Sequence, residues 1–351
     1  MLGDDIGLEV VPEAVRVMGA AAKAEGLSLT FTTLPIGWSS YLESGNTLPT
    51  RTLEGLAGLE GFLLGPIGHA AYPKGDPNCI NPHPVIRKRF DLYANHRPTR
   101  SVPGVTPIQG IDLLIVRENN EGFQPDRNMI AGSGEFQATE DAAFSIRVIT
   151  RQGSERVARA AFEAARRRGM RRRVTAIHKR TVFKLTDGLF MKTVEEVAAG
   201  YPDIRLEQYQ VDTFAMHLVM RPQEFDVVLC TNLFGDILSD EAAGLVGGLG
   251  LAPGLNVGES RAMAQATHGS APDIAGRGIA NPYAMIASGA MLLDWLGARR
   301  QEPALEAAAS RIQRALDRIL QDPRTRTPDL GGSASTEAMG RAAAAACQEA
   351  A

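Results

Sequence analysis

The sequence predicts an α/β fold made of two domains, and three observations support this prediction. The chain has 351 residues, enough for two domains that each bury a core. Short apolar runs alternate with longer amphipathic or alanine-rich stretches, the pattern of parallel strands joined by helices. No repeat or low-complexity linker divides the chain. We therefore expect two α/β domains that are interleaved along the sequence.

Composition argues against several classes of protein. The 37 basic and 40 acidic residues leave a net charge of −3, which gives no overall case for nucleic acid or membrane partners. The three cysteines are widely spaced and form no CxxC pair, which argues against a disulfide framework or a cysteine-rich zinc site. No apolar run approaches the ~18 residues of a membrane span, and no signal-peptide pattern is present. We expect a cytoplasmic protein.

The first expected element is a helix over residues 9–24, which follows the turn Gly-Asp-Asp-Ile-Gly at residues 3–7. Such a turn ordinarily follows a strand, and here only Met1 and Leu2 stand before it. Either that strand lies outside this sequence or the turn begins the fold by itself.

The remaining elements follow from apolar runs and helical patterns. Buried strands are expected at residues 61–65, 112–116, 174–178 and 226–230. Helices are expected at residues 154–168, 190–199, 213–220, 237–245, 285–296 and 304–320. In "RRRGMRRR", residues 166–173, Gly169 is placed to cap a helix, so the cations indicate a solvated helix end rather than a nucleic-acid patch.

The most specific candidate site is "TNLFGDILSDEAAG", residues 231–244, directly after a predicted strand. Ligands of α/β proteins bind beyond the carboxyl ends of such strands. Asp236 and Asp240 are four residues apart, so both carboxylates lie on one face of the following helix. A divalent cation would relieve their repulsion, and oxygen ligands favour Mg²⁺ or Mn²⁺. The alternative is that these acids only complement the helix dipole.

Asp212, in "YQVDTFAMHL", also stands between a strand and a helix. Taken alone it is best interpreted as an N-cap. Together with Asp236 and Asp240 it would complete a cation site of three carboxylates.

Arg87, Arg97 and Arg117 stand near strand or loop boundaries. Guanidinium groups bind carboxylates in a bidentate manner, so three that converge would hold a di- or tricarboxylate, whereas separate ones would form surface salt bridges. Arg117 opens the polar run that follows the strand at residues 112–116. Lys179 also follows a strand, and a lysine with a lowered pKa near carboxylates and a metal acts as a general base; otherwise it is a solvated loop residue.

The loop "HGSAPDIAGRGIANP", residues 268–282, is rich in small residues that let backbone amides approach a phosphate or an adenine. It does not match G-x-G-x-x-G, so an ordinary Rossmann site is not supported.

These motifs together resemble the isocitrate/3-isopropylmalate dehydrogenase family of metal-dependent β-decarboxylating dehydrogenases. The resemblance runs from the turn at residues 3–7 to "TPDLGGSAST" at residues 327–336, and it is closest to the isopropylmalate, tartrate and D-malate branch. It implies one domain of residues 1–92 and 247–351 and a second of residues 93–246, with the active site in the cleft between them. It also implies a homodimer whose active sites are shared between subunits.

The resemblance assigns roles to individual residues. Lys179 and Asp212 match the lysine and the first aspartate, which the neighbouring subunit supplies, and Asp212, Asp236 and Asp240 match the metal ligands. Arg87, Arg97 and Arg117 match the arginines that hold the malate-type carboxylates. Asp273 stands where an acid accepts the adenosine ribose hydroxyls in NAD-dependent members, which predicts NAD. The loop residues that match the cofactor site are His268, Gly269, Ser270, Ala271, Pro272, Asp273 and Asn281.

The implied reaction is oxidation of a 2-hydroxy dicarboxylic acid followed by loss of CO₂, with Mg²⁺ or Mn²⁺ acidifying the hydroxyl and stabilising the enolate. Family members carry a tyrosine seven residues after the third arginine, and this chain has Gln124 there. A carboxamide is no useful acid, so protonation of the enolate should be slowed, by up to ~10²–10⁴-fold. Two alternatives follow: a member that binds ligand with little or no turnover, and a tartrate- or malate-type dehydrogenase without efficient decarboxylation.

Other departures from the family pattern lie elsewhere in the chain. Asp5 replaces a usual glycine of the first turn, and Thr181 replaces an asparagine after the lysine. Asn81 and His83 stand where the family reads the distal group of the substrate, so that group is unassigned.

Overall fold

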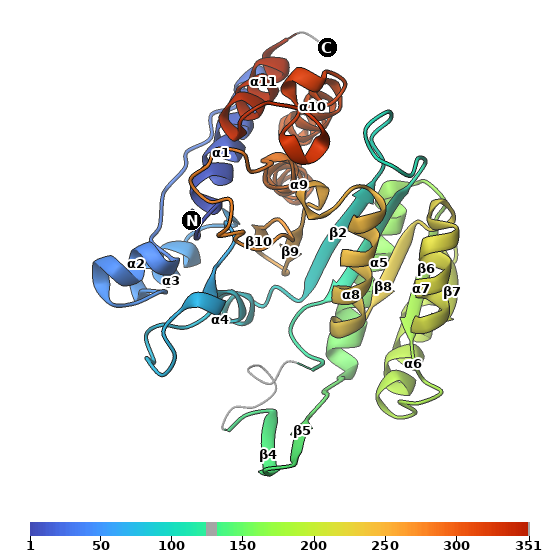
Figure 1. The fold of residues 1–351 in the computed structure, drawn as a ribbon. Helices are drawn as coiled ribbons and strands as arrows, with labels where there is room; N and C mark the ends of the chain where they lie inside the picture. Colours follow the sequence, from blue (N-terminus) through green and yellow to red (C-terminus); the bar gives the residue numbers. More distant parts are fainter. Residues whose placement is uncertain (124–131, 350–351) are drawn as a thin grey trace.

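The computed structural model describes residues 1–123 and 132–349. A mixed sheet crosses the molecule (Figure 1), and its strands lie in the order β1-β10-β9-β2-β3-β8-β6-β7. Their bounds are Gly61–Leu63, Ala262–Ala264, Leu255–Val257, Ala94–Arg100, Asp112–Glu118, Val227–Cys230, Arg173–His178 and Arg205–Gln210, in that order. The predicted α/β class is confirmed.

The expected parallel pairing holds in one half of the sheet. Strands β3, β8, β6 and β7 pair in parallel, as does β1 with β10. Strand β2 is antiparallel to both β3 and β9, and β9 is antiparallel to β10. Because β3, β8 and β6 run in the same direction, their carboxyl ends meet at one edge of the sheet.

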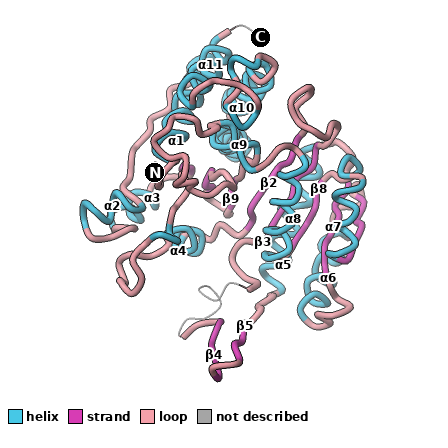
Figure 2. The backbone as a smooth tube through the Cα atoms, viewed as in Figure 1, coloured by secondary structure: helices cyan, strands magenta, loops and turns pink. Residues whose placement is uncertain are grey.

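Helices cover both faces of the parallel half, so its strands are apolar on both sides. Leu114 and Val116 pack toward α5 (Arg151–Arg168) and α6 (Thr186–Ala198). Leu113 and Ile115 pack toward α7 (Val211–Met220) and α8 (Asn232–Leu245). Figure 2 shows these strands in magenta among the cyan helices.

A second group of helices gathers at the other end of the molecule (Figure 1). They share one core cluster, and their bounds are α1 Gly7–Ala24, α9 Tyr283–Arg300, α10 Pro303–Ile319 and α11 Thr336–Gln348. Three shorter helices complete this part: α2 Gly37–Ser44, α3 Thr50–Ala57 and α4 Pro82–Arg89. No helix among the described residues is long and apolar enough to cross a membrane.

Several boundaries differ from those expected. Strand β3 continues past Val116 through Arg117 and Glu118, because it keeps pairing with β2 as far as Ala94. Helix α8 begins at Asn232 instead of residue 237, so Asp236 lies in its second turn. Gly169 ends α5 with a φ of +61°, as expected for a left-handed cap. The arginines around it pair with acids, Arg166 with Asp203 for example.

The antiparallel arm formed by β4 (Glu135–Thr139) and β5 (Ala142–Ser145) was not predicted from the sequence. It projects away from the sheet (Figure 1), and its strand residues are mostly exposed. Phe136 and Phe144 stack on it with ring centroids 5.2 Å apart, and both rings are half exposed.

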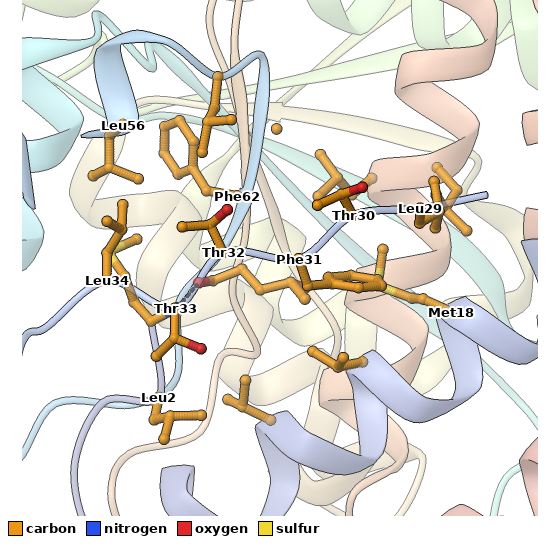
Figure 3. A pocket seen from close by; sticks show the side chains of 18 of the residues that line it. Leu2, Met18, Leu29, Thr30, Phe31, Thr32, Thr33, Leu34, Leu56 and Phe62 are labelled. Carbon is orange, nitrogen blue, oxygen red and sulfur yellow. Dashed lines mark hydrogen bonds between the residues drawn. The ribbon is translucent and has the colours of Figure 1, made fainter. Parts of the chain in front are cut away.

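The first turn packs beside β1. The Met1 amino group donates to the Leu63 carbonyl at 3.1 Å, and the Gly65 amide donates to the Met1 carbonyl at 3.1 Å. Residues 28–34 run extended nearby, and within the described chain their backbone forms no hydrogen bond. An apolar cavity of about 220 Å³ lies here (Figure 3), and its lining includes Leu2, Met18, Phe31, Leu34 and Phe62.

Candidate active site

Arg117 lies at the end of β3, where the chain reaches the carboxyl edge of the sheet, and only 4% of it is exposed. Its Nε donates to the Asn232 carbonyl at 2.9 Å, and its Nη2 donates to the Asn232 side-chain oxygen at 2.8 Å. Its Nη1 pairs with Asp236. A Cβ at Gly235 would lie 2.7 Å from the Arg117 side chain, so this glycine lets α8 begin directly against the arginine.

Arg97 reaches the same carboxylates from the middle of β2. Its Nη1 lies 3.2 Å from Asp236 Oδ1 and 3.6 Å from Asp240 Oδ1, and it donates to Ser239 Oγ at 2.7 Å. Two of the three predicted arginines therefore meet at Asp236, and Arg97 also reaches Asp240. The aspartate side chains remain about half exposed, at 49% and 55%, so this cluster is open to a ligand.

The electrostatics of this cluster are unequal. Burial raises the pKa of Asp240, and the nearby Asp236 carboxylate raises it further, while Arg97 and Arg117 oppose the shift. An added cation would favour the charged form of this carboxyl group. Asp240 would therefore be stabilised in its charged form by a cation bound beside it.

Arg87 lies apart from the other two arginines, on α4. Its Nη2 donates to Gln265 Oε1 at 3.1 Å. The Gln265 amide nitrogen lies 2.8 Å from His83 Nε2. Gln265 therefore links Arg87 to His83, one of the positions at which the sequence departs from the family pattern.

A chain of buried amides connects Arg87 with Arg97. Asn256 Nδ2 lies 3.5 Å from Gln265 Oε1, and its Oδ1 accepts from Asn95 Nδ2 at 2.8 Å and from Asn119 Nδ2 at 3.0 Å. Asn95 Oδ1 in turn accepts from Arg97 Nε at 2.5 Å. Sequence reasoning did not identify these amides, because an isolated asparagine carries no spacing signal and only the fold brings β2, β3 and β9 side by side.

Lys179 and Asp212 form a separate pair. The Lys179 Nζ lies 2.6 Å from Asp212 Oδ1, and this hydrogen bond lowers the pKa of Asp212. The N-cap interpretation of Asp212 is wrong, since Gln210 is the N-cap residue of α7. Among the described residues of the single chain, no three acidic, histidine or cysteine side chains are arranged to hold a metal, so Asp212 does not join Asp236 and Asp240 there.

The small-residue loop at 268–282 is held against the first turn, the start of α1 and the segment that precedes the C-terminal helix. The Ile6 amide donates to the Ser270 carbonyl at 3.2 Å, and Glu9 accepts from the Gly276 amide at 2.6 Å. Asn281 donates to Asp329 at 2.9 Å. Among the other predicted cofactor residues, Gly269, Pro272 and Asp273 are exposed, and Ala271 is partly buried. Burial lowers the pKa of His268, the first residue of the loop.

Gln124 lies outside the described residues. Two acids just before it, Glu118 and Glu121, were not predicted as site residues from the sequence. Burial raises the pKa of Glu118, and burial together with the Glu118 carboxylate raises the pKa of Glu121 to about 7. Glu118 accepts from the amides of Asn120 and Glu121 at 2.7 and 2.9 Å, and so shapes the turn that leaves β3.

Comparisons with known proteins agree over nearly the full length. The family model described as isocitrate/isopropylmalate dehydrogenase matches residues 1–343. An isocitrate/homoisocitrate dehydrogenase of Thermus thermophilus is 45% identical over 340 residues, which cover 96% of this chain and 94% of that protein. A 3-isopropylmalate dehydrogenase of Methanothermobacter thermautotrophicus is 41% identical over 338 residues, with the same coverage of 96% and 94%.

Among solved structures, an isocitrate dehydrogenase from Methylococcus capsulatus superposes with a TM-score of 0.87 at 40% identity. The alignment covers 99% of this chain and 98% of that structure.

Proposed function

The chain belongs to the isocitrate/isopropylmalate dehydrogenase family, and from this premise we propose that it oxidatively decarboxylates a 2-hydroxy dicarboxylic acid of the 3-substituted D-malate type, such as 3-isopropylmalate. The family's reaction is metal-dependent oxidative decarboxylation of hydroxy acids. The observation that carries the proposal is the convergence of Arg97 and Arg117 on Asp236 and Asp240. Guanidinium groups that can bind substrate carboxylates thus lie next to carboxylates that can bind a metal ion.

In this proposal Arg97 and Arg117 bind the carboxylates of the substrate. In the structure their guanidinium groups neutralise Asp236, and both arginines are buried. A substrate carboxylate would take over these guanidinium groups and release oxygens of Asp236. We assign Arg87 to the same substrate site, at the end where it contacts Gln265, which in turn contacts His83.

The donor set fits Mg²⁺ or Mn²⁺, since it consists of carboxylates without sulfur or imidazole. Asp236 and Asp240 would hold the ion with Asp212 of a neighbouring subunit. When bound, the ion acidifies the substrate hydroxyl.

We propose that the working unit is a homodimer in which Lys179 and Asp212 serve the partner's site. There the Lys179 amine would accept the hydroxyl proton as hydride leaves for the cofactor. Supporting this, apolar side chains are exposed around Lys179 and along α7 and α8: Val182, Leu185, Met216, Val219, Met220, Leu233 and Ile237.

We assign NAD as the cofactor. Family members use NAD or NADP, and Asp273 is exposed on the loop at 268–282, where its carboxylate is free to accept ribose hydroxyls but would repel a 2′-phosphate. The start of this loop is held in place by the amino-terminal turn, where the Ile6 amide donates to the Ser270 carbonyl.

The domain division that we propose is residues 1–92 with 247–351, and residues 93–246. The hydrophobic core clusters support this division. Two of the four clusters consist of residues outside 93–246, with Val102 and the partly buried Val105 as exceptions, and the other two clusters lie entirely within 93–246. We also place the protein in the cytoplasm, from its cysteine usage.

Two alternatives depend on Gln124. If no other group replaces the missing acid, the protein would release a keto acid, as a tartrate- or malate-type dehydrogenase does, or would bind ligand with little turnover. The retention of Arg97, Arg117, Asp236 and Asp240 in one cluster favours an active enzyme.

The test is an assay with NAD, Mn²⁺ and a panel of malate, tartrate, isopropylmalate, isocitrate and homoisocitrate isomers. We expect NADH with stoichiometric CO₂ from a 3-substituted malate. NADH without CO₂ would identify a dehydrogenase that does not decarboxylate. Calorimetric binding without NADH from any acid would contradict the proposal and leave a ligand-binding protein.

A further inference from the structure

We propose that a buried ion pair, Arg147 with Asp187, positions Lys179, an inference that rests on the proposed catalytic role of that lysine. Arg147 Nη1 lies 2.6 Å from Asp187 Oδ1, and the side chains are 7% and 0% exposed. The second carboxylate oxygen of Asp187 accepts the backbone amide of Lys179 at 2.5 Å. One carboxylate thus joins a buried cation to the backbone of the lysine.

The arginine is held by three separate segments of the chain. Its guanidinium carbon lies 4.8 Å from the ring centroid of Phe183, 5.3 Å from that of Phe234 and 5.7 Å from that of Phe123. Phe183 belongs to the turn after Lys179, Phe234 to the first turn of α8, and Phe123 to the segment after β3. Three aromatic faces around one cation stabilise its charge where water is excluded.

Hydrogen bonds join the same segments. Arg147 donates to Thr186 Oγ1 at 3.1 Å and to Thr231 Oγ1 at 3.2 Å. Thr186 begins α6, and Thr231 is the N-cap residue of α8, the helix of Asp236. The pair therefore lies between the lysine turn and the start of the metal-binding helix.

Within the single chain, packing alone does not fix the lysine turn. Residues 180–185 are all exposed, and Leu185 is 88% exposed. With so little apolar contact within the subunit, the position of the turn depends on polar contacts. Two buried side chains supply such contacts, Asp187 to the amide of Lys179 and His178 to the amide of Arg180. Misplacing a catalytic group by about 1 Å can cost ~10²-fold in rate, so losing the Asp187 anchor should slow turnover even though neither residue of the pair is assigned to substrate.

A purely structural role is the competing interpretation, because removing one partner of any buried pair destabilises a protein. The chain offers a matched control. Arg168 Nε lies 2.9 Å from Asp226 Oδ1, Asp226 is fully buried, and this pair lies at the opposite, amino end of β8.

The test compares Arg147→Met, Asp187→Asn and the double variant Arg147→Met/Asp187→Leu with the control Asp226→Asn, all as full chains. The double variant replaces the pair by apolar groups and so guards against a simple failure to fold. Measurements are kcat and KM on the best acid of the panel, Mn²⁺ affinity by electron paramagnetic resonance, and hydrogen exchange of peptides containing Lys179.

We expect kcat to fall by roughly 10- to 100-fold in all three variants of the pair, with KM and Mn²⁺ affinity within about 2-fold of wild type. The Lys179 amide should exchange at least about 10-fold faster, while Asp226→Asn keeps kcat within about 2-fold. Unchanged kcat in the double variant, or an equal loss of kcat in the control, would overturn the proposal.

The exchange measurement does not depend on turnover. If wild type oxidises no acid on the panel, the proposed function fails, and unchanged Lys179 exchange in the variants would separately refute the anchoring role.

Discussion

At position 124, seven residues after Arg117, the chain carries glutamine, where the resemblance to the family leads us to expect a tyrosine. The change replaces a hydroxyl that can give up a proton by an amide that cannot. The consequence concerns the last step of the reaction and leaves the carboxylates and arginines of the site untouched.

We predict that Gln124→Tyr raises the rate of CO₂ release, by up to ~10²–10⁴-fold if enolate protonation is limiting. The measurement is the steady-state kcat, followed both as NADH formed and as CO₂ released. Gln124→Phe is the matched control, since it supplies the ring without the hydroxyl and should give no gain. No gain from tyrosine would mean that another group, for which Glu121 is the nearest candidate in sequence, already donates the proton.

His96 on β2 gives a second prediction at this scale. Burial, with a smaller effect of Arg167, lowers its pKa to about 4. Between pH ~6.5 and 4 the unfolded chain binds a proton that the folded chain does not, so the free energy of unfolding should decrease as pH falls through this range, by up to ~3 kcal/mol.

The measurement is urea unfolding at pH 4 to 7. His96→Gln should lose this part of the pH dependence, whereas the exposed His69→Gln should keep it. Equal pH dependence in the wild type and His96→Gln would show that His96 does not titrate differently on folding.

Among the elements, the turn before α1 carries a measurable strain. Asp5 occupies the position of a usual glycine and has a φ of +49°, in the left-handed region. Such a conformation disfavours a Cβ atom, although aspartate tolerates it better than most residues.

We predict that Asp5→Gly is more stable than Asp5→Ala by about 1 kcal/mol, because both lose the carboxylate and only alanine keeps the Cβ. Thermal and urea unfolding of the two variants would measure the difference. Equal stability would place Asp5 outside the left-handed conformation in solution.

The elements also show where periodicity was sufficient. The runs at residues 112–116, 174–178 and 226–230 were predicted as strands because they are buried on both faces and therefore continuously apolar. Strand β2 was missed because Asn95, His96, Arg97 and Pro98 give it a polar sequence, although it lies in the middle of the sheet. Its polar residues are the ones that form the network around the site.

For the whole molecule, the separation of Lys179 and Asp212 from the cluster on α8 has a direct consequence. If two copies complete each other's sites, a subunit that lacks one half remains useful to a partner that lacks the other half.

We predict that inactive Lys179→Met and Asp236→Asn proteins regain activity when they are mixed, unfolded and refolded together. Random pairing makes half of the dimers mixed, and each mixed dimer holds one intact site, so about a quarter of wild-type activity should return. Each variant refolded alone is the control. No recovery, with mixed dimers verified by mass spectrometry, would contradict shared sites.

The sequence by itself determined the α/β class, the family, and which residue types carry the chemistry, because these are written in local periodicity and in fixed spacings such as that of Asp236 and Asp240. It also indicated the amide at position 124. Only the tertiary structure decided that Arg97 and Arg117 meet at Asp236 while Arg87 contacts Gln265. It also decided that Asn256 and Asn95 connect Gln265 with Arg97. It likewise revealed the Arg147–Asp187 pair behind Lys179. These contacts join residues far apart in the chain, and a hydrogen bond between side chains depends on where the backbone brings them, which no short stretch of sequence records.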